Sequence, residues 1–283
     1  MNSLLAMFGF ELKRLMTPAR FFWWACVAAF PVCIVLLLHT FGDFGDVESM
    51  RRNMASQRHV GSQEQAILLS DTILTIVIYY LAPGIACMLG ALLTASPAVA
   101  SELEQHSWIY FATRPNGLFH LIVGKYLVAL VWAVSSTLLG LWISIAIAAI
   151  DNKWHVFVTL TQITILSAMA YSALYMMIGT LFYRRAMIFC VAYTAGVELG
   201  MSFVPAVINR LTIQYRLRAL LFQEDTLPRL MRNEDSFRTL FVSHTSPFQT
   251  VFWLVTLTAV FLAVALTSVQ VREFTGAAET EST

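Results

Sequence analysis

The sequence predicts an all-α membrane protein with six transmembrane helices. Six apolar stretches each have about the 20 residues that a helix needs to cross a hydrocarbon layer of about 30 Å. They occupy residues 22–40, 66–95, 120–150, 156–182, 187–207 and 248–270. Of the 283 residues, 58% are hydrophobic and 12% are charged, whereas soluble domains average about 25% charged residues. Continuous apolar runs favour helices over the alternating strands of a barrel.

The first segment, residues 1–21, is expected to form an amphipathic helix on the membrane surface. Apolar residues recur at helical spacing on one side while charged residues lie elsewhere, namely Leu5, Phe8, Leu12 and Leu15 against Glu11, Lys13 and Arg14. Pro18 is expected to end this helix or bend it into the first span.

Two further segments lie outside the predicted spans. Leu and Ile alternate with arginines in the first half of residues 208–247, which predicts short re-entrant or interfacial helices on the extracytoplasmic side. The tail, residues 273–283, is rich in Thr, Ala, Glu and Ser and is predicted to be disordered. The sequence therefore predicts one transmembrane domain over residues 1–283.

Both termini are expected in the cytoplasm. An even number of spans places the two ends on one face, although the count of basic residues over all loops does not favour this orientation. Two local features do, because basic residues precede the first span directly and the very short loop at 183–186 carries Arg184-Arg185. The net charge of +1 gives no indication of a nucleic-acid partner.

The most specific stretch is the segment between the second and third spans, residues 97–119. Its charged and aromatic side chains include Glu102, Glu104, Trp108, Tyr110 and Arg114. A turn is indicated at 114–117, where Arg-Pro-Asn-Gly occurs. Gly124-Lys125 then opens the third span, and the Lys125 ammonium can reach back to the same membrane face.

This pattern resembles the type-2 ABC transporter permease family. The two glutamates, Thr113-Arg114-Pro115 and Gly124-Lys125 follow the order of the family's motifs. His106-Ser107 departs from it, because members often carry a small residue such as glycine after the glutamates. Glu198, Pro205 and residues 211–220 resemble a later part of several such permeases, so the resemblance covers nearly the whole chain.

The resemblance implies an exporter subunit in a prokaryotic plasma (inner) membrane. It would pair with a second permease chain, identical or homologous, and dock on a separate cytoplasmic ATP-binding-cassette ATPase through residues 97–119. The contact residues would be Glu102, Glu104, Trp108, Tyr110 and Arg114. Reversing the charges of the two glutamates is then expected to weaken ATPase capture without unfolding the spans. From the residues alone, the segment is more typical of a solvated loop with ordinary belt aromatics.

No catalytic, cofactor or metal site is predicted in this chain. The sequence has no Gly-x-x-x-x-Gly-Lys-Ser/Thr phosphate loop and no His-Glu-x-x-His motif. We therefore expect that it is not an enzyme and that ATP and Mg are bound by the partner ATPase.

Glu198 is the most costly residue in the predicted spans, because a carboxylate at membrane depth costs at least a few kcal/mol unless it is paired or hydrated. Three roles are open: a structural hydrogen bond to Tyr193, Ser202 or another helix, a place on the substrate path or dimer interface, and proton coupling. Glu198→Gln is expected to preserve folding and ATPase binding. Asp71 is expected at a helix end near the headgroups rather than on a pathway.

Two other functions compete with the ABC permease. An ion-driven secondary transporter would use Glu198 for coupling, although the chain has no inverted repeat. A non-transporting membrane scaffold would form a stable partner complex without ATP-dependent flux.

Overall fold

The computed structural model describes residues 2–41, 71–104, 117–148, 150, 153–200, 212–223 and 246–271. Nearly all of these residues are helical and none of them lies in a strand. Residues 71–79 are helical and continue into η1. The labelled elements are α1 (Asn2–Leu15), α2 (Pro18–Phe41), η1 (Tyr80–Ala86), α5 (Cys87–Glu104), α7 (Gly117–Ile147), α8 (Lys153–Leu181), η2 (Tyr183–Arg185), α9 (Ala186–Tyr193), η3 (Thr194–Gly200), α10 (Ile213–Gln223) and α13 (Pro247–Val271).

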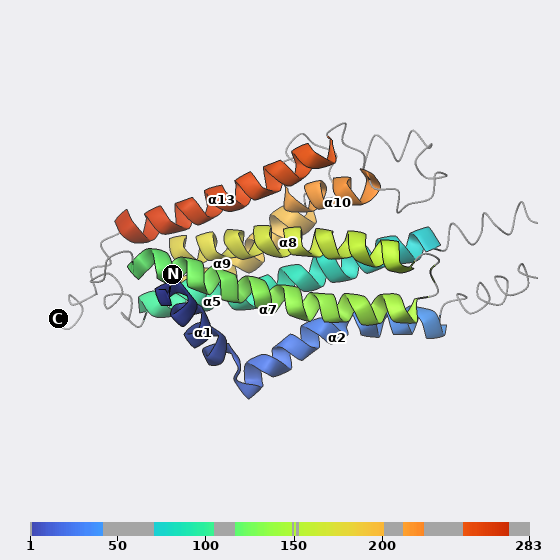
Figure 1. Ribbon diagram of the computed structural model, residues 1–283, viewed down its shortest axis with the longest axis horizontal. Coiled ribbons are helices and arrows are strands. Elements are labelled where there is room, and N and C mark those ends of the chain that lie inside the picture. Colours follow the sequence, from blue (N-terminus) through green and yellow to red (C-terminus); the bar gives the residue numbers. More distant parts are fainter. Residues whose placement is uncertain are drawn as a thin grey trace, which may run out of the picture.

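The long helices form a bundle along the longest axis of the molecule (Figure 1). Within the described residues, 5 helices are long and apolar enough to cross a membrane. They are Pro18–Thr40, Asp71–Glu102, Gly117–Ile147, Lys153–Leu181 and Pro247–Val271. These match five of the six predicted spans, as expected for a multi-pass membrane protein.

The remaining predicted span, residues 187–207, is the fifth along the chain and is described only in its first part. It begins as α9 and continues as η3, a wider π-helical turn that ends the described stretch at Gly200. Residues 201–211 lie outside the described part of the chain, so six spans remain a prediction.

The surface helix and the first span meet at a sharp corner. Proline has no backbone N–H and its φ suits the first helical position, so Pro18 starts α2 rather than continuing α1. The Thr17 carbonyl accepts the first hydrogen bond of α2, from the N–H of Phe21, at 2.9 Å. Helix α1 consequently crosses one end of the bundle at an angle (Figure 1), which is called the α1 end below.

Glycines allow the closest helix contacts. A Cβ on Gly140 of α7 would lie 2.5 Å from the carbonyl oxygen of Ala28 in α2. A Cβ on Gly179 of α8 would lie 2.6 Å from the carbonyl oxygen of Ser96 in α5. Small residues permit such close backbone approach in membrane bundles, and α8 packs against both α5 and α13.

The second span contains a π-helical segment around Pro83. Proline cannot donate the usual helix hydrogen bond, and a wider turn relieves the strain that this causes. Neighbouring helices donate to the carbonyls of this segment: Ser167 Oγ to Pro83 at 2.7 Å, and Gln214 Nε2 to Gly84 at 3.4 Å. Such side-chain donors are what make a proline tolerable within a membrane helix.

Helix α10 is the described part of the predicted extracytoplasmic segment 208–247. It packs against α8 and α13, and it buries Ile213, Leu217, Leu220 and Leu221. The residues from 224 to 245, where a second short helix is predicted, lie outside the described part, as do the loop at 42–70 and the predicted disordered tail at 273–283.

Candidate functional site

Four charged residues from three helices meet at the α1 end of the bundle. Glu11 and Arg14 come from α1, Glu102 from the end of α5, and Lys125 from the third turn of α7. We call these residues the charge ring, because each carboxylate contacts both cations. Glu11, Glu102 and Lys125 are 6%, 5% and 4% exposed.

The ion-pair distances show that each carboxylate of the charge ring contacts both of its cations. Lys125 Nζ lies 3.1 Å from Glu102 Oε1 and 3.2 Å from Glu11 Oε1. Arg14 donates from Nη1 to Glu102 Oε1, and the same nitrogen lies 3.8 Å from Glu11 Oε1. The hydrogen bond to Glu102 raises the pKa of the Arg14 guanidinium. Two anions and two cations therefore compensate one another, with the two carboxylates and Lys125 buried and the Arg14 side chain 37% exposed.

Gly124 and Lys125 form the site on α7 where α1 docks. A Cβ on Gly124 would lie 3.1 Å from Cγ of Met7, so the glycine makes room for the surface helix. The adjacent lysine then binds Glu11 one turn further along α1. The docking of α1 on the third span therefore explains both residues.

The charge ring changes one sequence-based expectation. The resemblance implies that Glu102 faces a partner ATPase, but its carboxylate is buried and holds Arg14 and Lys125. Reversing its charge would place three cations together, so this change is expected to disturb the packing of α1, α5 and α7 rather than to leave the spans intact. Glu104 is the last residue of α5, and nothing is described of its side chain. Trp108, Tyr110 and Arg114 lie outside the described residues.

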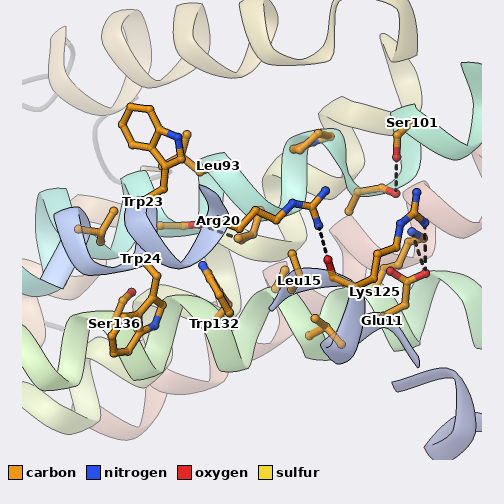
Figure 2. Close-up of a pocket in the computed structure, with 18 of the residues that line it drawn as sticks. Glu11, Leu15, Arg20, Trp23, Trp24, Leu93, Ser101, Lys125, Trp132 and Ser136 are labelled. Atoms are coloured by element: carbon orange, nitrogen blue, oxygen red, sulfur yellow. Dashed lines mark hydrogen bonds and ion pairs between the residues drawn. The ribbon is translucent and has the colours of Figure 1, made fainter. Parts of the chain in front are cut away.

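A cavity of about 310 Å³ opens beside the charge ring, between α1, α2, α5 and α7. Figure 2 shows Glu11 and Lys125 at one end, Arg20 in the middle, and the indoles of Trp23, Trp24 and Trp132 toward the other end. Pockets of this size are large enough for part of a small organic ligand.

Glu198 lies in η3 and is 0% exposed. Its Oε2 accepts hydrogen bonds from the Tyr171 hydroxyl at 3.0 Å and the Gln214 N–H at 3.1 Å. Its Oε1 accepts from the Ile213 N–H at 3.2 Å and the Tyr193 hydroxyl at 3.5 Å. The carboxylate therefore caps the first turn of α10, where helix N–H groups lack partners within the helix and favour negative charge.

This geometry supports the structural role among the three that the sequence left open for Glu198. The predicted bond to Tyr193 is present, whereas Ser202 lies outside the described residues. Four donors on two oxygens also alter the expectation for Glu198→Gln, because an amide nitrogen cannot accept the bonds that one of the oxygens now receives.

Asp71 lies far from both groups. It is the first described residue of the second span, at the end of the bundle opposite α1 (Figure 1). It is partly buried, and its carbonyl accepts a hydrogen bond from the Thr75 hydroxyl at 2.8 Å. The residues before it lie outside the described part of the chain, so its expected place at a helix end near the headgroups stays a prediction.

Sequence reasoning missed Glu11 and Arg14 as partners of Glu102 and Lys125. A charged pair three residues apart on a surface helix is normally solvated, and nothing in its spacing shows that it faces inward. It also missed Tyr171, although a signal was present: a tyrosine hydroxyl in the middle of an apolar span needs an acceptor.

Comparison with family models, curated proteins and solved structures finds no match for this chain.

Proposed function

We propose that this chain is the membrane-spanning permease subunit of an ATP-binding-cassette transporter. In this proposal it is an exporter that pairs with a second permease chain in a prokaryotic plasma membrane. The α1 end faces the cytoplasm, and the segment between α5 and α7 docks on a separate ATPase that binds ATP and Mg. The motif order in the sequence motivates the proposal, and the charge ring supports it physically.

The charge ring carries the proposal because of the helices that it joins. Residues 105–116 begin where α5 ends and finish where α7 starts. Glu102 lies two residues before the end of α5, and Lys125 lies in the third turn of α7. Their ion pair ties the two helices together, and Glu11 and Arg14 add α1. A force applied to residues 105–116 would therefore move three helices together, as coupling to an ATPase requires.

The hydrogen bonds of Glu198 do not favour an ion-driven carrier. A proton-coupling carboxylate has to change partners as it gains and loses a proton. Glu198 instead caps α10 with both oxygens, and protonation would weaken these bonds. The scaffold alternative agrees with the same contacts and differs in its partner, so the partner decides between the two.

The test is affinity purification of the chain from native membranes in mild detergent, with mass spectrometry of the proteins that accompany it. We expect a stoichiometric ATP-binding-cassette ATPase. Trp108→Ala and Tyr110→Ala should each reduce its recovery. Trp154→Ala is the matched control, since Trp154 is 75% exposed at the start of α8, at the opposite end of the bundle.

Absence of an ATPase from an intact, monodisperse preparation would contradict the permease function and favour a scaffold or a carrier. An ATPase that is retained by both the Trp108→Ala and the Tyr110→Ala variant would keep the function but remove the docking role of residues 105–116. Equal loss in the Trp154→Ala control would show that the variants act through stability rather than contact.

A further inference from the structure

We propose that the cavity between α1, α2, α5 and α7 binds the headgroup of an anionic phospholipid, with Arg20 as the phosphate ligand. The lipid comes from the membrane leaflet at the α1 end. This proposal rests on the cavity itself and does not depend on the transport function proposed above.

The cavity has a polar half and an apolar half, as an amphipathic ligand requires. Its polar end is formed by charge-ring members and Arg20, and its apolar end by Trp23, Trp24 and Trp132. Figure 2 shows Arg20 between these two ends. A headgroup at Arg20 would place the first part of an acyl chain against the indoles.

The charge of the cavity selects an anion. Within the charge ring, two carboxylates balance two cations. Arg20 also lines the cavity, and no described carboxylate lies within ion-pair distance of it. Among the described residues, the wall therefore carries one positive charge without a carboxylate partner.

Arg20 keeps most of its hydrogen-bonding capacity for a ligand. Its Nη1 donates to the Arg14 carbonyl at 3.4 Å, which is its only side-chain bond to the described residues. A guanidinium has five N–H donors in a planar fork that matches phosphate oxygens. The long bond to Arg14 orients the side chain along the cavity and leaves the other N–H groups for an anion.

Two indoles add donors beside the apolar surface. Trp24 already donates from Nε1 to Ser135 Oγ at 3.0 Å. No described group accepts a hydrogen bond from the indole N–H of Trp23 or Trp132. An indole with an apolar body and a free N–H suits the boundary between headgroups and acyl chains.

The position of Arg20 in the chain sets its depth. It is the third residue of α2, directly after the corner at which the surface helix turns into the bundle. Trp23 and Trp24 follow one turn deeper. Basic pockets between membrane helices at this level bind the phosphates of anionic lipids.

The experiment measures tryptophan quenching by brominated lipid. The protein keeps Trp23, Trp24 and Trp132, while Trp108, Trp142, Trp154 and Trp253 are replaced by Phe. It is reconstituted in phosphatidylcholine vesicles that contain equal fractions of brominated phosphatidylglycerol or brominated phosphatidylcholine. We expect stronger quenching by the anionic lipid. Arg20→Gln should lower that preference about fivefold, the equivalent of about 1 kcal/mol for one cation beside anionic lipid.

Two variants separate a bound headgroup from general attraction and from misfolding. Arg20→Lys keeps the charge and should retain most of the preference. Arg185→Gln removes an exposed cation in η2, which follows α8 at the α1 end and does not line the cavity, so it should leave the preference unchanged.

Equal quenching by the two lipids would overturn the proposal, as would a preference that Arg20→Gln leaves intact. A preference that Arg185→Gln removes to the same extent would show surface attraction and overturn it as well. Loss of the preference in excess inorganic phosphate would assign the cavity to a soluble anion instead of a lipid.

Discussion

Glu198 connects η3 to the start of α10 through hydrogen bonds in the interior of the bundle. A buried carboxylate at membrane depth is tolerated only when its oxygens are supplied with donors. Two of its donors are backbone N–H groups at the start of α10, which would otherwise lack partners. These hydrogen bonds therefore supply donors to the buried carboxylate and an acceptor to the first N–H groups of α10.

Glu198→Gln is accordingly expected to lower stability by about 1–3 kcal/mol, because the amide group leaves donors in a buried site without an acceptor. The measurement is the melting temperature of the detergent-solubilised protein. Tyr193→Phe, which removes only the 3.5 Å bond, should cost less. A Glu198→Gln protein that melts like the unchanged one would contradict the capping role and restore proton coupling as an explanation.

At this scale, the sequence predicted the cost of Glu198 and one of its four donors. It could not predict the other three, because hydrophobic patterns reveal which residues are buried but not how helices rotate. Two of the three are backbone N–H groups of α10. Every residue except proline has such a group, so the residue type does not reveal which ones bind Glu198. The same rotation decides that Glu11 of α1 faces Lys125 rather than water.

At the scale of helices, close packing depends on two glycines that have no space for a Cβ. Gly140 lets α7 approach α2 beside Pro31, and Gly179 lets α8 approach α5. At both positions the nearest atom is a backbone carbonyl oxygen of the neighbouring helix. By contrast, Gly196 lies in η3, and no described atom lies within 4 Å of the position that a Cβ would take there.

Gly179→Ala should therefore destabilise the protein by about 1–3 kcal/mol, because α5 and α8 have to move apart to relieve the 2.6 Å contact. Gly196→Ala is the matched control and should be neutral or slightly stabilising, since alanine favours helices. Melting temperatures measured side by side decide the matter. Equal losses in the two variants would mean that backbone freedom, rather than the contact with Ser96, makes these glycines necessary.

The element boundaries show what apolar periodicity predicts well. Four predicted spans match described helices to within four residues at each end, since a run of about 20 apolar residues has few alternatives to a membrane helix. The second helix runs to Glu102, past the predicted end at residue 95. The π-helical turns at 80–86 and 194–200 were not predicted. Pro83 gave a local signal for the first, whereas the second depends on contacts with α8 and α10.

For the whole molecule, α1 and the C-terminal end of α13 lie at the same end of the bundle (Figure 1). The prediction that both termini lie on the cytoplasmic face stays a prediction. Helix α5 ends and helix α7 begins at that end too (Figure 1). The proposed function therefore requires that the α1 end faces the cytoplasm.

Single cysteines at two exposed lysines test this orientation. In a variant whose 4 native cysteines are replaced by serine or alanine, Lys13→Cys marks the α1 end and Lys153→Cys marks the opposite end. A membrane-impermeant maleimide applied to intact cells should label position 153, and position 13 only after lysis. The reverse pattern would place residues 105–116 outside the cell and exclude docking to a cytoplasmic ATPase.

The charge ring also sets an order in which the molecule can be completed. Arg14 reaches its carboxylate partner 88 positions later in the chain, and Glu11 meets Lys125 later still. A ribosome therefore releases the surface helix first, yet this helix has no fixed place until the third span has entered the bilayer. Helix α1 therefore docks only after α5 and α7 are in place. A bulky group fused before α1 would hinder this docking step more than the insertion of any span.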